Sequence, residues 1–389
     1  MNFLEFPYKH ISILVMPTFQ CNMNCVYCFN GKHTTIQSSQ QMSEETLTRL
    51  FEIVIPYYSD IRFIWHGGEP LLMGKGFFER MLDIQRSFNT QGAIIKNSIQ
   101  SNLTLMTNDM AEFLVSNGFH IGSSFDGTTN EETRHNSSRI LSGFDAVKNA
   151  GGHNGFICVV QSRNIDHLIE DYEWFKKHGI GYTLNQYLSS LPHDQDPLFV
   201  SAEKYVSRIC ELFDYWMQDT TCNIGVSNFE VFLDYLLLNK KYLCTYNSCM
   251  GKHVGVHFDG KIYGCNRAFP NEYCFGSVYD YSDIRQCFFS DGFNNLLKNA
   301  IERRTYCKKN CDCFDFCAGG CNSWALAGGN VARPNEYFCT TMVPVYKHVK
   351  HRIKSIIGVP IEQLVEKWNP YLIRILEINK GQQNNSGAR

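Results

Sequence analysis

The sequence predicts an α/β fold in which helices flank a parallel sheet, followed by a smaller region rich in cysteine. Up to about residue 220, six short apolar runs are each followed by a stretch with helical periodicity. This alternation is typical of a parallel sheet, because two parallel strands need a helix-length connection between them. Six units rather than eight predict a partial (β/α)6 barrel similar to a TIM barrel. The 17 cysteines, most of them in the second half, indicate the additional region.

Each element has a local reason. The strands are short apolar runs, and we expect them at residues 11–16, 61–65, 93–101, 119–125, 156–161 and 181–187. The helices carry apolar residues at helical spacing, and we expect them at residues 44–55, 76–88, 108–118, 143–151, 165–179 and 201–217. Ser43 and Ser201 are typical N-caps. Further on, Asp259-Gly260 between GVHF and KIYGC predicts a two-residue β-hairpin turn.

The composition excludes several classes of protein. The 389 residues exceed one typical domain of roughly 100–200 residues, and a net charge of −2 argues against binding to nucleic acid or to an anionic membrane. The first apolar run does not read as a signal peptide, and the apolar stretch 231–243 is interrupted by Asp234, Lys240 and Lys241. We therefore expect a soluble, cytoplasmic protein. In a reducing cytoplasm, 17 cysteines indicate metal binding or redox chemistry rather than disulfides.

Polar and glycine-rich segments follow three of the predicted strands directly, at the strand ends where such folds place their chemistry. Cys21-x3-Cys25-x2-Cys28 follows the first strand, HGGEP (66–70) the second, and GSSFDG (122–127) the fourth. The glycines of HGGEP allow a ligand to approach the backbone. Three thiolates on a four-iron cluster leave one iron open to a substrate or cofactor. The spacing alone also allows a zinc half-site.

These motifs resemble those of the radical S-adenosylmethionine (radical SAM) enzymes over residues 10–220. The cysteine triplet, with Tyr27 before its last cysteine, is similar to their cluster-binding signature, HGGEP to their GGEP motif, and GSSFDG to their ISLDG segment. The resemblance implies a [4Fe-4S] cluster on Cys21, Cys25 and Cys28, whose open iron binds S-adenosylmethionine. It further implies a 5′-deoxyadenosyl radical that abstracts hydrogen from an unactivated C–H bond, chemistry that the cofactor supplies and the protein positions.

The resemblance also assigns contacts to S-adenosylmethionine. Gly67, Gly68 and Glu69 would hold its methionine amino group. Ser124 would contact its ribose or carboxylate, and Arg139, in HNSSR, would pair with the carboxylate. Tyr27 belongs to the same expected cofactor-binding set. A strand-end hydrogen bond is an equal alternative for Ser124.

The second half of the chain resembles the SPASM domain of radical SAM enzymes that act on peptides. It contains Cys249-x10-Gly260-x4-Cys265, followed by a block from 307 to 321 and a last cysteine at 339. The first gap of that block has three residues instead of two, and Cys313 is an additional thiol within it. Carried over by position, two auxiliary [4Fe-4S] clusters have four ligands each: Cys244, Cys249, Cys265 and Cys321 for one, and Cys307, Cys311, Cys317 and Cys339 for the other. Structural zinc sites are the alternative, since four cysteines also suit Zn²⁺.

The overall layout resembles that of the anaerobic sulfatase-maturating enzymes, which oxidise a Cys or Ser side chain to formylglycine. Those enzymes carry an aspartate as general base directly after the second hairpin cysteine, where this chain has Asn266. Because a neutral amide does not accept a proton at ordinary pH, we expect instead an intramolecular C–C or thioether crosslink in a ribosomally made peptide. Sulfatase maturation, peptide epimerisation and small-molecule dehydrogenation remain alternatives, with Asp259 or a nearby histidine as a substitute base. We assign no catalytic side chain.

The expected domains are a radical SAM core at 1–235, a SPASM domain at 236–342 and a helical segment with a disordered tail at 343–389. The expected partners are a precursor peptide and a reductant such as flavodoxin or ferredoxin, with no nucleic acid and no membrane. An iron–sulfur electron carrier without catalysis is the alternative from another class, although a carrier needs neither GGEP nor an open iron.

Overall fold

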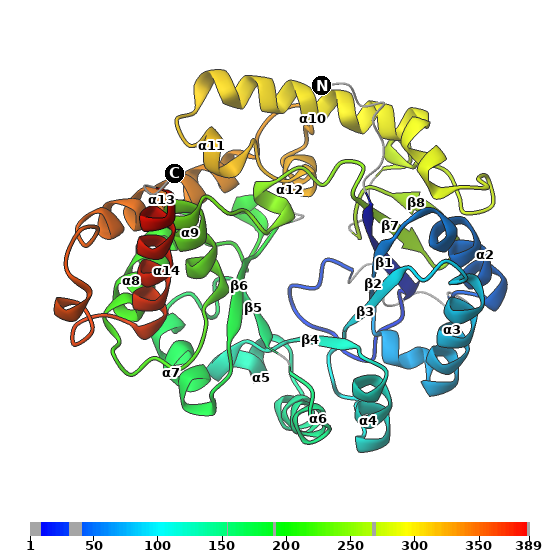
Figure 1. Cartoon of the computed structure of the whole chain (residues 1–389), viewed down its shortest axis with the longest axis horizontal. Coiled ribbons are helices and arrows are strands. Elements are labelled where there is room, and N and C mark those ends of the chain that lie inside the picture. Colours follow the sequence, from blue (N-terminus) through cyan, green and yellow to red (C-terminus); the bar gives the residue numbers. More distant parts are fainter. Residues whose placement is uncertain (1–8, 31–40, 154, 190–191, 267–269, 387–389) are drawn as a thin grey trace. The chain divides into compact units, whose positions relative to one another are not determined.

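The computed structural model describes residues 9–30, 41–153, 155–189, 192–266 and 270–386, and the side chains of these up to residue 379 (Figure 1). The chain forms two compact units. The first comprises residues 1–123, 134–154 and 249–302, and the second residues 124–133, 155–248 and 303–389. Each unit is therefore assembled from segments that are distant in the sequence.

The first unit is built around a mostly parallel sheet. Its strands run in the spatial order β4-β3-β2-β1-β7-β8. They are β1 His10–Thr18, β2 Asp60–Gly67, β3 Ile94–Gln100, β4 His120–Ser124, β7 His253–His257 and β8 Ile262–Tyr263. Strand β1 lies at the centre, where Ile13 aligns with Phe63 of β2 and with Val254 of β7. Strands β7 and β8 are antiparallel and form the predicted hairpin, with Gly260 in its turn at φ +83°.

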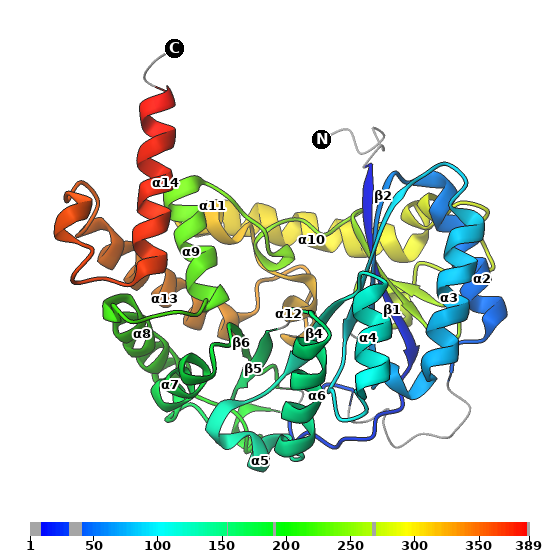
Figure 2. The ribbon, with the colours of Figure 1, turned by 60° about the horizontal axis from the view of Figure 1, so that its bottom comes forward.

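Helices pack on this sheet through their apolar faces. They are α2 Glu44–Val54, α3 Lys75–Phe88, α4 Asn108–Ser116 and α6 Ser137–Asn149, and α10 Asp291–Asn310 begins in this unit. Ser43 caps α2 as predicted, since its hydroxyl accepts from the backbone N–H of Thr46. Phe51, Phe63 and Trp65 are fully buried between the helices and the sheet. Figures 1 and 2 both show α2 and α3 side by side along β1, β2 and β3.

The second unit contains one parallel strand pair and most of the C-terminal helices. The strands are β5 Phe156–Val160 and β6 Tyr182–Gln186. The helices are α5 Asn130–Thr133, α7 Leu168–His178, α8 Ala202–Gln218, α9 Ser227–Leu238, α11 Phe314–Cys317, α12 Asn322–Ala327, α13 Glu336–Lys354 and α14 Pro370–Ser386. Helix α13 packs on α8, and α14 packs on α9. Ser201 caps α8, as predicted.

The predicted fold class is confirmed: the protein is α/β with a parallel sheet and a cysteine-rich C-terminal region. All six predicted strands and the six helices after them are present, with α6 beginning six residues earlier than expected. The predicted helical segment at 343–389 contains the end of α13, the 3₁₀ turn Ile361–Gln363 and α14, which continues through Ser386. Residues 387–389 of the predicted disordered tail lie outside the described residues. The motif-based domain boundaries remain a prediction, and the compact units cut across them because β7 pairs with β1.

None of the helices in the described part of the chain is long and apolar enough to cross a membrane.

Candidate cofactor and cluster sites

The cysteine triplet lies on the loop that leaves the carboxyl end of β1. Cys21, Cys25 and Cys28 are half-buried. The loop is held by local hydrogen bonds: the N–H of Met23 donates to Cys21 Sγ at 3.4 Å, and the N–H of Cys28 donates to the carbonyl of Cys25 at 3.1 Å. Burial raises the pKa of the Cys21 thiol to about 11, so metal binding here requires that the metal displace a proton.

Gly67 and Gly68 place the end of β2 against this loop. The N–H of Gly68 donates to the carbonyl of Thr18 at 2.9 Å, and the N–H of Glu69 donates to that of Gln20 at 2.7 Å. A Cβ on Gly67 would lie 2.5 Å from the Thr18 oxygen, and one on Gly68 would lie 2.0 Å from the Gln20 oxygen. Gly67 also has φ +111°. The missing side chains of Gly67 and Gly68 therefore allow the backbone of the loop after β1 to approach closely. The sequence had suggested instead that these glycines allow a ligand to approach.

The side chain of Glu69 joins two loops. It is 1% exposed. Oε1 accepts from the N–H of Leu71 at 3.0 Å and from the hydroxyl of Ser101 at 2.8 Å, and Oε2 accepts from the N–H of Asn102 at 2.7 Å. Burial raises the pKa of the Glu69 carboxyl, while these donors and the charge of Arg134 lower it. The carboxylate thus fixes the loop after β2 to the loop after β3.

The loop after β3 contributes residues that the sequence analysis did not single out. Asn102 directs Nδ2 to Cys21 Sγ at 3.8 Å and to the Asn22 side-chain oxygen at 2.9 Å. Asn22 in turn donates to the hydroxyl of Thr104 at 2.7 Å. The rule that flagged the loops after the first, second and fourth strands applies equally to the sequence Ser-Asn directly after β3. Three successive strand ends therefore meet at the triplet.

Tyr27, between the second and third cysteines, is bound by a buried arginine. Arg134 is 8% exposed, and its Nη1 donates to the Tyr27 hydroxyl at 2.9 Å. Its guanidinium also lies 5.9 Å from the centre of the Tyr27 ring. Arg139, which the sequence analysis favoured, lies five residues further on, in the first turn of α6, and is exposed. The structure therefore brings Arg134, and not the predicted Arg139, to the triplet loop.

Ser124 ends β4 and opens the segment 124–133 of the second unit, in which it is half-buried. Polar side chains fix this segment. Asp126 accepts from the N–H of Val159 at 3.0 Å and from the Thr133 hydroxyl at 2.7 Å. Asp171 of α7 accepts from both the N–H and the hydroxyl of Thr128, each at 2.7 Å. Ser124 thus follows a strand into a rigidly bonded turn.

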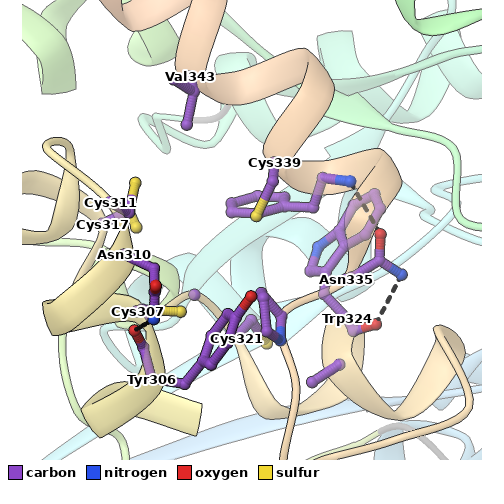
Figure 3. A pocket seen from close by; sticks show the side chains of 15 residues that line it. Tyr306, Cys307, Asn310, Cys311, Cys317, Cys321, Trp324, Asn335, Cys339 and Val343 are labelled. Carbon is purple, nitrogen blue, oxygen red and sulfur yellow. Dashed lines mark hydrogen bonds between the residues drawn. The ribbon is translucent and has the colours of Figure 1, made fainter.

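A cavity of about 220 Å³ in the second unit brings five cysteines together. Its lining includes Cys307, Cys311, Cys317, Cys321 and Cys339, together with the rings of Tyr306, Trp324 and Phe338. Figure 3 shows the cavity, whose lining side chains come from α10, α11, α12, α13 and the turns between these helices. By the same measure a single bound water needs on the order of 10–15 Å³. The cavity therefore has room for a group of several atoms.

Helix α13 is fixed at both sides of Cys339. Asn335 caps the helix, since its oxygen accepts from the N–H of Phe338 at 2.8 Å, and its amide donates to the carbonyl of Trp324 at 2.9 Å (Figure 3). One turn further on, the Thr341 hydroxyl accepts from Gln186 at the end of β6 at 3.0 Å. Burial raises the pKa of the Cys339 thiol to about 12. Cys339 is thus a half-buried thiol on a helix that is anchored to a strand end.

The additional thiol of this block lies apart from the cavity lining. Cys313 forms a compact group with Cys311 and Asp312, whose ligand atoms all lie within 4.8 Å of one another. Asp312 is also paired with Lys347 at 3.1 Å. Of the two neighbouring cysteines, Cys311 and not Cys313 is among the described residues that line the cavity.

The other predicted set of four is divided between the units. Cys249 and Cys265 belong to the first unit, while Cys244 and Cys321 belong to the second. Cys265 follows β8, and its backbone passes so close to Gly255 that a Cβ there would lie 2.3 Å from the Cys265 oxygen. Next to it, the Asn266 side-chain oxygen accepts from the Cys265 thiol at 3.2 Å. Residues 267–269 lie outside the described part.

Comparison with known proteins supports the motif-based resemblance. Residues 15–175 match the Radical SAM superfamily. The chain is 26% identical over 373 residues to a cysteine-type anaerobic sulfatase-maturating enzyme of Clostridium perfringens, covering 89% of this chain and 98% of that protein. It is 24% identical to a serine-type anaerobic sulfatase-maturating enzyme of Bacteroides thetaiotaomicron, covering 88% of this chain and 90% of that protein.

The similarity extends to three dimensions. A solved structure of native anSMEcpe with bound AdoMet and Cp18Cys peptide has a TM-score of 0.80 and 25% identity to this chain, covering 89% of this chain and 98% of the other. The resemblance to radical SAM enzymes that act on peptides is therefore confirmed.

Proposed function

We propose that this chain is a radical SAM enzyme that removes hydrogen from a side chain of a peptide or protein. The observation that carries this proposal is the convergence of the triplet with Glu69 and Asn102 at three strand ends, combined with similarity to sulfatase-maturating enzymes over nearly the full length of both chains.

The residues fit the cofactors that the proposal requires. Three half-buried thiols on one loop suit a [4Fe-4S] cluster with an open iron, and four thiols around a cavity of about 220 Å³ suit a complete auxiliary cluster. A single zinc ion would leave most of that cavity unfilled. We propose Cys244, Cys249, Cys265 and Cys321 as the ligands of the second auxiliary cluster. When bound, S-adenosylmethionine on a reduced cluster supplies the 5′-deoxyadenosyl radical that takes a hydrogen atom from the substrate.

The residues around the triplet would position the cofactor. The backbone of Gly67–Glu69 would bind its amino group, because both the hydrogen bonds and the close contacts of the glycines fix that backbone. Ser124 would contact its ribose or carboxylate. The buried cation beside Tyr27 is Arg134, which makes it a better placed partner for an anionic group than the exposed Arg139.

Two reactions compete for the specific function. Formylglycine formation on a Cys or Ser side chain is favoured by the similarity to two kinds of sulfatase-maturating enzyme. We therefore place it ahead of crosslinking, which reverses the order that the sequence alone suggested. Crosslinking stays as the second candidate because of Asn266. This residue occupies the position of the expected general base, and its amide cannot accept the proton that formylglycine formation releases.

If formylglycine is formed, another residue must accept a proton. Asp259 is exposed at the tip of the hairpin and faces Lys261 at 3.5 Å. His257 is the last residue of β7, and its ring packs edge-on against that of Phe19, just beyond β1, with 5.0 Å between the ring centroids. His257 is the better placed of the two, because Phe19 belongs to the loop that leads to the triplet.

The test is mass spectrometry of anaerobic reactions with reduced enzyme, S-adenosylmethionine and one peptide per tube. One peptide carries the Cys-x-Pro-x-Arg sequence, and the other is any small peptide encoded beside the gene. An aldehyde in the first peptide supports formylglycine formation. Loss of two hydrogens from the second, with the first unchanged, supports crosslinking. Either reaction should release 5′-deoxyadenosine, and Cys25→Ala should abolish that release. An electron carrier without catalysis would release none.

Iron content and one substitution complete the test. Three clusters require about twelve irons per chain, and about four would contradict the auxiliary assignment. Asn266→Asp is expected to raise the rate of formylglycine formation. An unchanged product and rate would mean that position 266 takes no part in proton transfer. The proposal also includes a reductant such as flavodoxin or ferredoxin, and a cytoplasmic location, since reduced clusters need a reducing compartment.

A further inference from the structure

Arg303 is a fully buried cation that donates a hydrogen bond to Gly319, a residue that lines the cysteine-rich cavity. It is 1% exposed and belongs to the largest fully buried side chains of the described chain. Its Nε donates to the carbonyl of Gly319 at 2.9 Å, its Nη2 donates to the Asn322 side-chain oxygen at 2.5 Å, and its Nη1 donates to the carbonyl of Val331. These three acceptors are neutral oxygens.

The position of Arg303 relates it to the cavity in two ways. It precedes Cys307 by four residues on α10, so both side chains lie on one face of the helix, one turn apart. Gly319, which it binds, lines the cavity, and Asn322 directly follows Cys321. The guanidinium thus ties α10 to the turn that carries two of the lining cysteines.

Water screens a buried charge far less than an exposed one, so a buried guanidinium acts strongly on charged groups around it. Four thiolates around one cavity would concentrate negative charge at this place.

We propose that Arg303 is the fixed positive charge of the group held by Cys307, Cys311, Cys317 and Cys339, and that it sets the reduction potential of that group. This inference rests on the proposed function, which puts an iron–sulfur cluster in the cavity. Cluster potentials depend on net charge and on the surrounding polar groups. One added electron makes the cluster more negative, so a buried cation favours the reduced form, and its loss lowers the potential.

The test is a redox titration followed by electron paramagnetic resonance under anaerobic conditions. The background is a variant in which Cys21, Cys25 and Cys28 are alanine, so that any remaining iron is auxiliary. In this background Arg303→Gln removes the charge, Arg303→Lys keeps it without the planar fork, and Lys308→Gln removes an exposed charge next to Cys307. Lys308→Gln is the control for a charge of the same sign at the surface, because solvent screens an exposed charge.

We expect Arg303→Gln to shift the ratio of reduced to oxidised cluster at least tenfold toward the oxidised form, which is 59 mV for a one-electron couple. One auxiliary potential should move and the other should stay. Arg303→Lys and Lys308→Gln should remain near the parent. Equal shifts in Arg303→Gln and Arg303→Lys, or no shift in either, would overturn the inference, because the charge would then not be the cause.

A further variant covers the case in which Arg303→Gln does not retain its iron. Asn322→Asp leaves Arg303 in place and sets a carboxylate beside its Nη2, which neutralises the charge within an ion pair. It should lower the same potential, and an unchanged potential would overturn the inference. Failure of the proposed function looks different: the background variant itself would then hold no iron.

Discussion

Asp171 offers a pH-dependent test of how the segment after β4 is held. Its side chain is 1% exposed. Oδ1 receives both hydrogen bonds from Thr128, while Oδ2 is buried without a hydrogen-bond partner in the described structure. Gly127, at φ +62°, makes this approach possible, because a Cβ there would lie 2.3 Å from Oδ1. The perturbation is Asp171→Asn, which keeps one acceptor oxygen and removes the titration.

The sign follows from the proton balance. Burial raises the pKa of Asp171 from 3.8 to about 7; the Thr128 donors and His167 lower it, and Asp126 raises it. Between pH 3.8 and about 7 the folded state therefore holds a proton that the unfolded state has lost. The contribution of Asp171 to the free energy of unfolding is complete below this window and is lost as the pH rises through it, by about 1.4 kcal/mol per pH unit.

From pH 5 to pH 7 the wild type should therefore lose about 2–3 kcal/mol relative to Asp171→Asn. The assay is urea unfolding of both proteins at pH 5, 6, 7 and 8, with the difference taken at each pH so that other titrating groups cancel. The control is Glu170→Gln, an exposed position next to it on α7, where the difference should not change with pH. A pH-independent difference for Asp171→Asn would refute the argument that the carboxyl is held protonated near neutral pH.

Two further substitutions test the triplet loop. Gly68→Ala places a Cβ 2.0 Å from a backbone oxygen that cannot give way, so we expect loss of about four irons per chain, whereas Gly76→Ala in α3, with 3.7 Å to its nearest atom, should retain all iron. The measurement is iron content after anaerobic reconstitution, and equal iron in both variants would contradict the packing argument. Tyr27→Phe removes the acceptor of Arg134 Nη1 and should lower the free energy of unfolding by about 1–3 kcal/mol, since a buried charged donor loses a bond. A change within error in urea unfolding would show that the arginine finds another acceptor.

The strand and helix pattern could be predicted from the sequence because its signals are local. Apolar runs of strand length, helical periodicity and caps such as Ser43 act over a few residues. The pairing of β7 with β1 could not be predicted in this way. It joins residues about 240 positions apart, and the sequence around 253 shows only that a hairpin forms there. The hairpin was expected as part of a separate domain, yet it extends the barrel sheet.

The cluster motif could be predicted, but not which side chains surround it. The arginine is an example: the sequence offers Arg134 and Arg139 five residues apart in one loop region. His135 and Asn136 have positive φ, and α6 begins directly after them. The chain changes direction at these two residues. Arg134 is therefore buried beside Tyr27, whereas Arg139, in the first turn of α6, is exposed to solvent. Asn and His adopt positive φ more often than other residues that are not glycine, but only in a minority of cases, so the sequence alone does not locate the two left-handed residues.

Glu69 shows how the acid of a cofactor-binding motif can act on the protein rather than on a ligand. Three hydrogen bonds reach its carboxylate, from the N–H groups of Leu71 and Asn102 and from the Ser101 hydroxyl. Two of these donors are backbone N–H groups on opposite oxygens. In Glu69→Gln, an isosteric change, one of the two must therefore face the amide NH₂, whichever way the amide turns. A buried N–H left without an acceptor costs about 1–3 kcal/mol.

We therefore expect Glu69→Gln to lower the free energy of unfolding by about that amount and to weaken iron binding by the triplet, even before S-adenosylmethionine is added. Glu45→Gln, at an exposed position on α2, is the matched control. Urea unfolding and iron content of the cofactor-free protein measure both effects. If Glu69→Gln folds as well as the control, retains its iron and loses only affinity for S-adenosylmethionine, then the carboxylate acts on the ligand directly, and the three hydrogen bonds are not what holds the loops together.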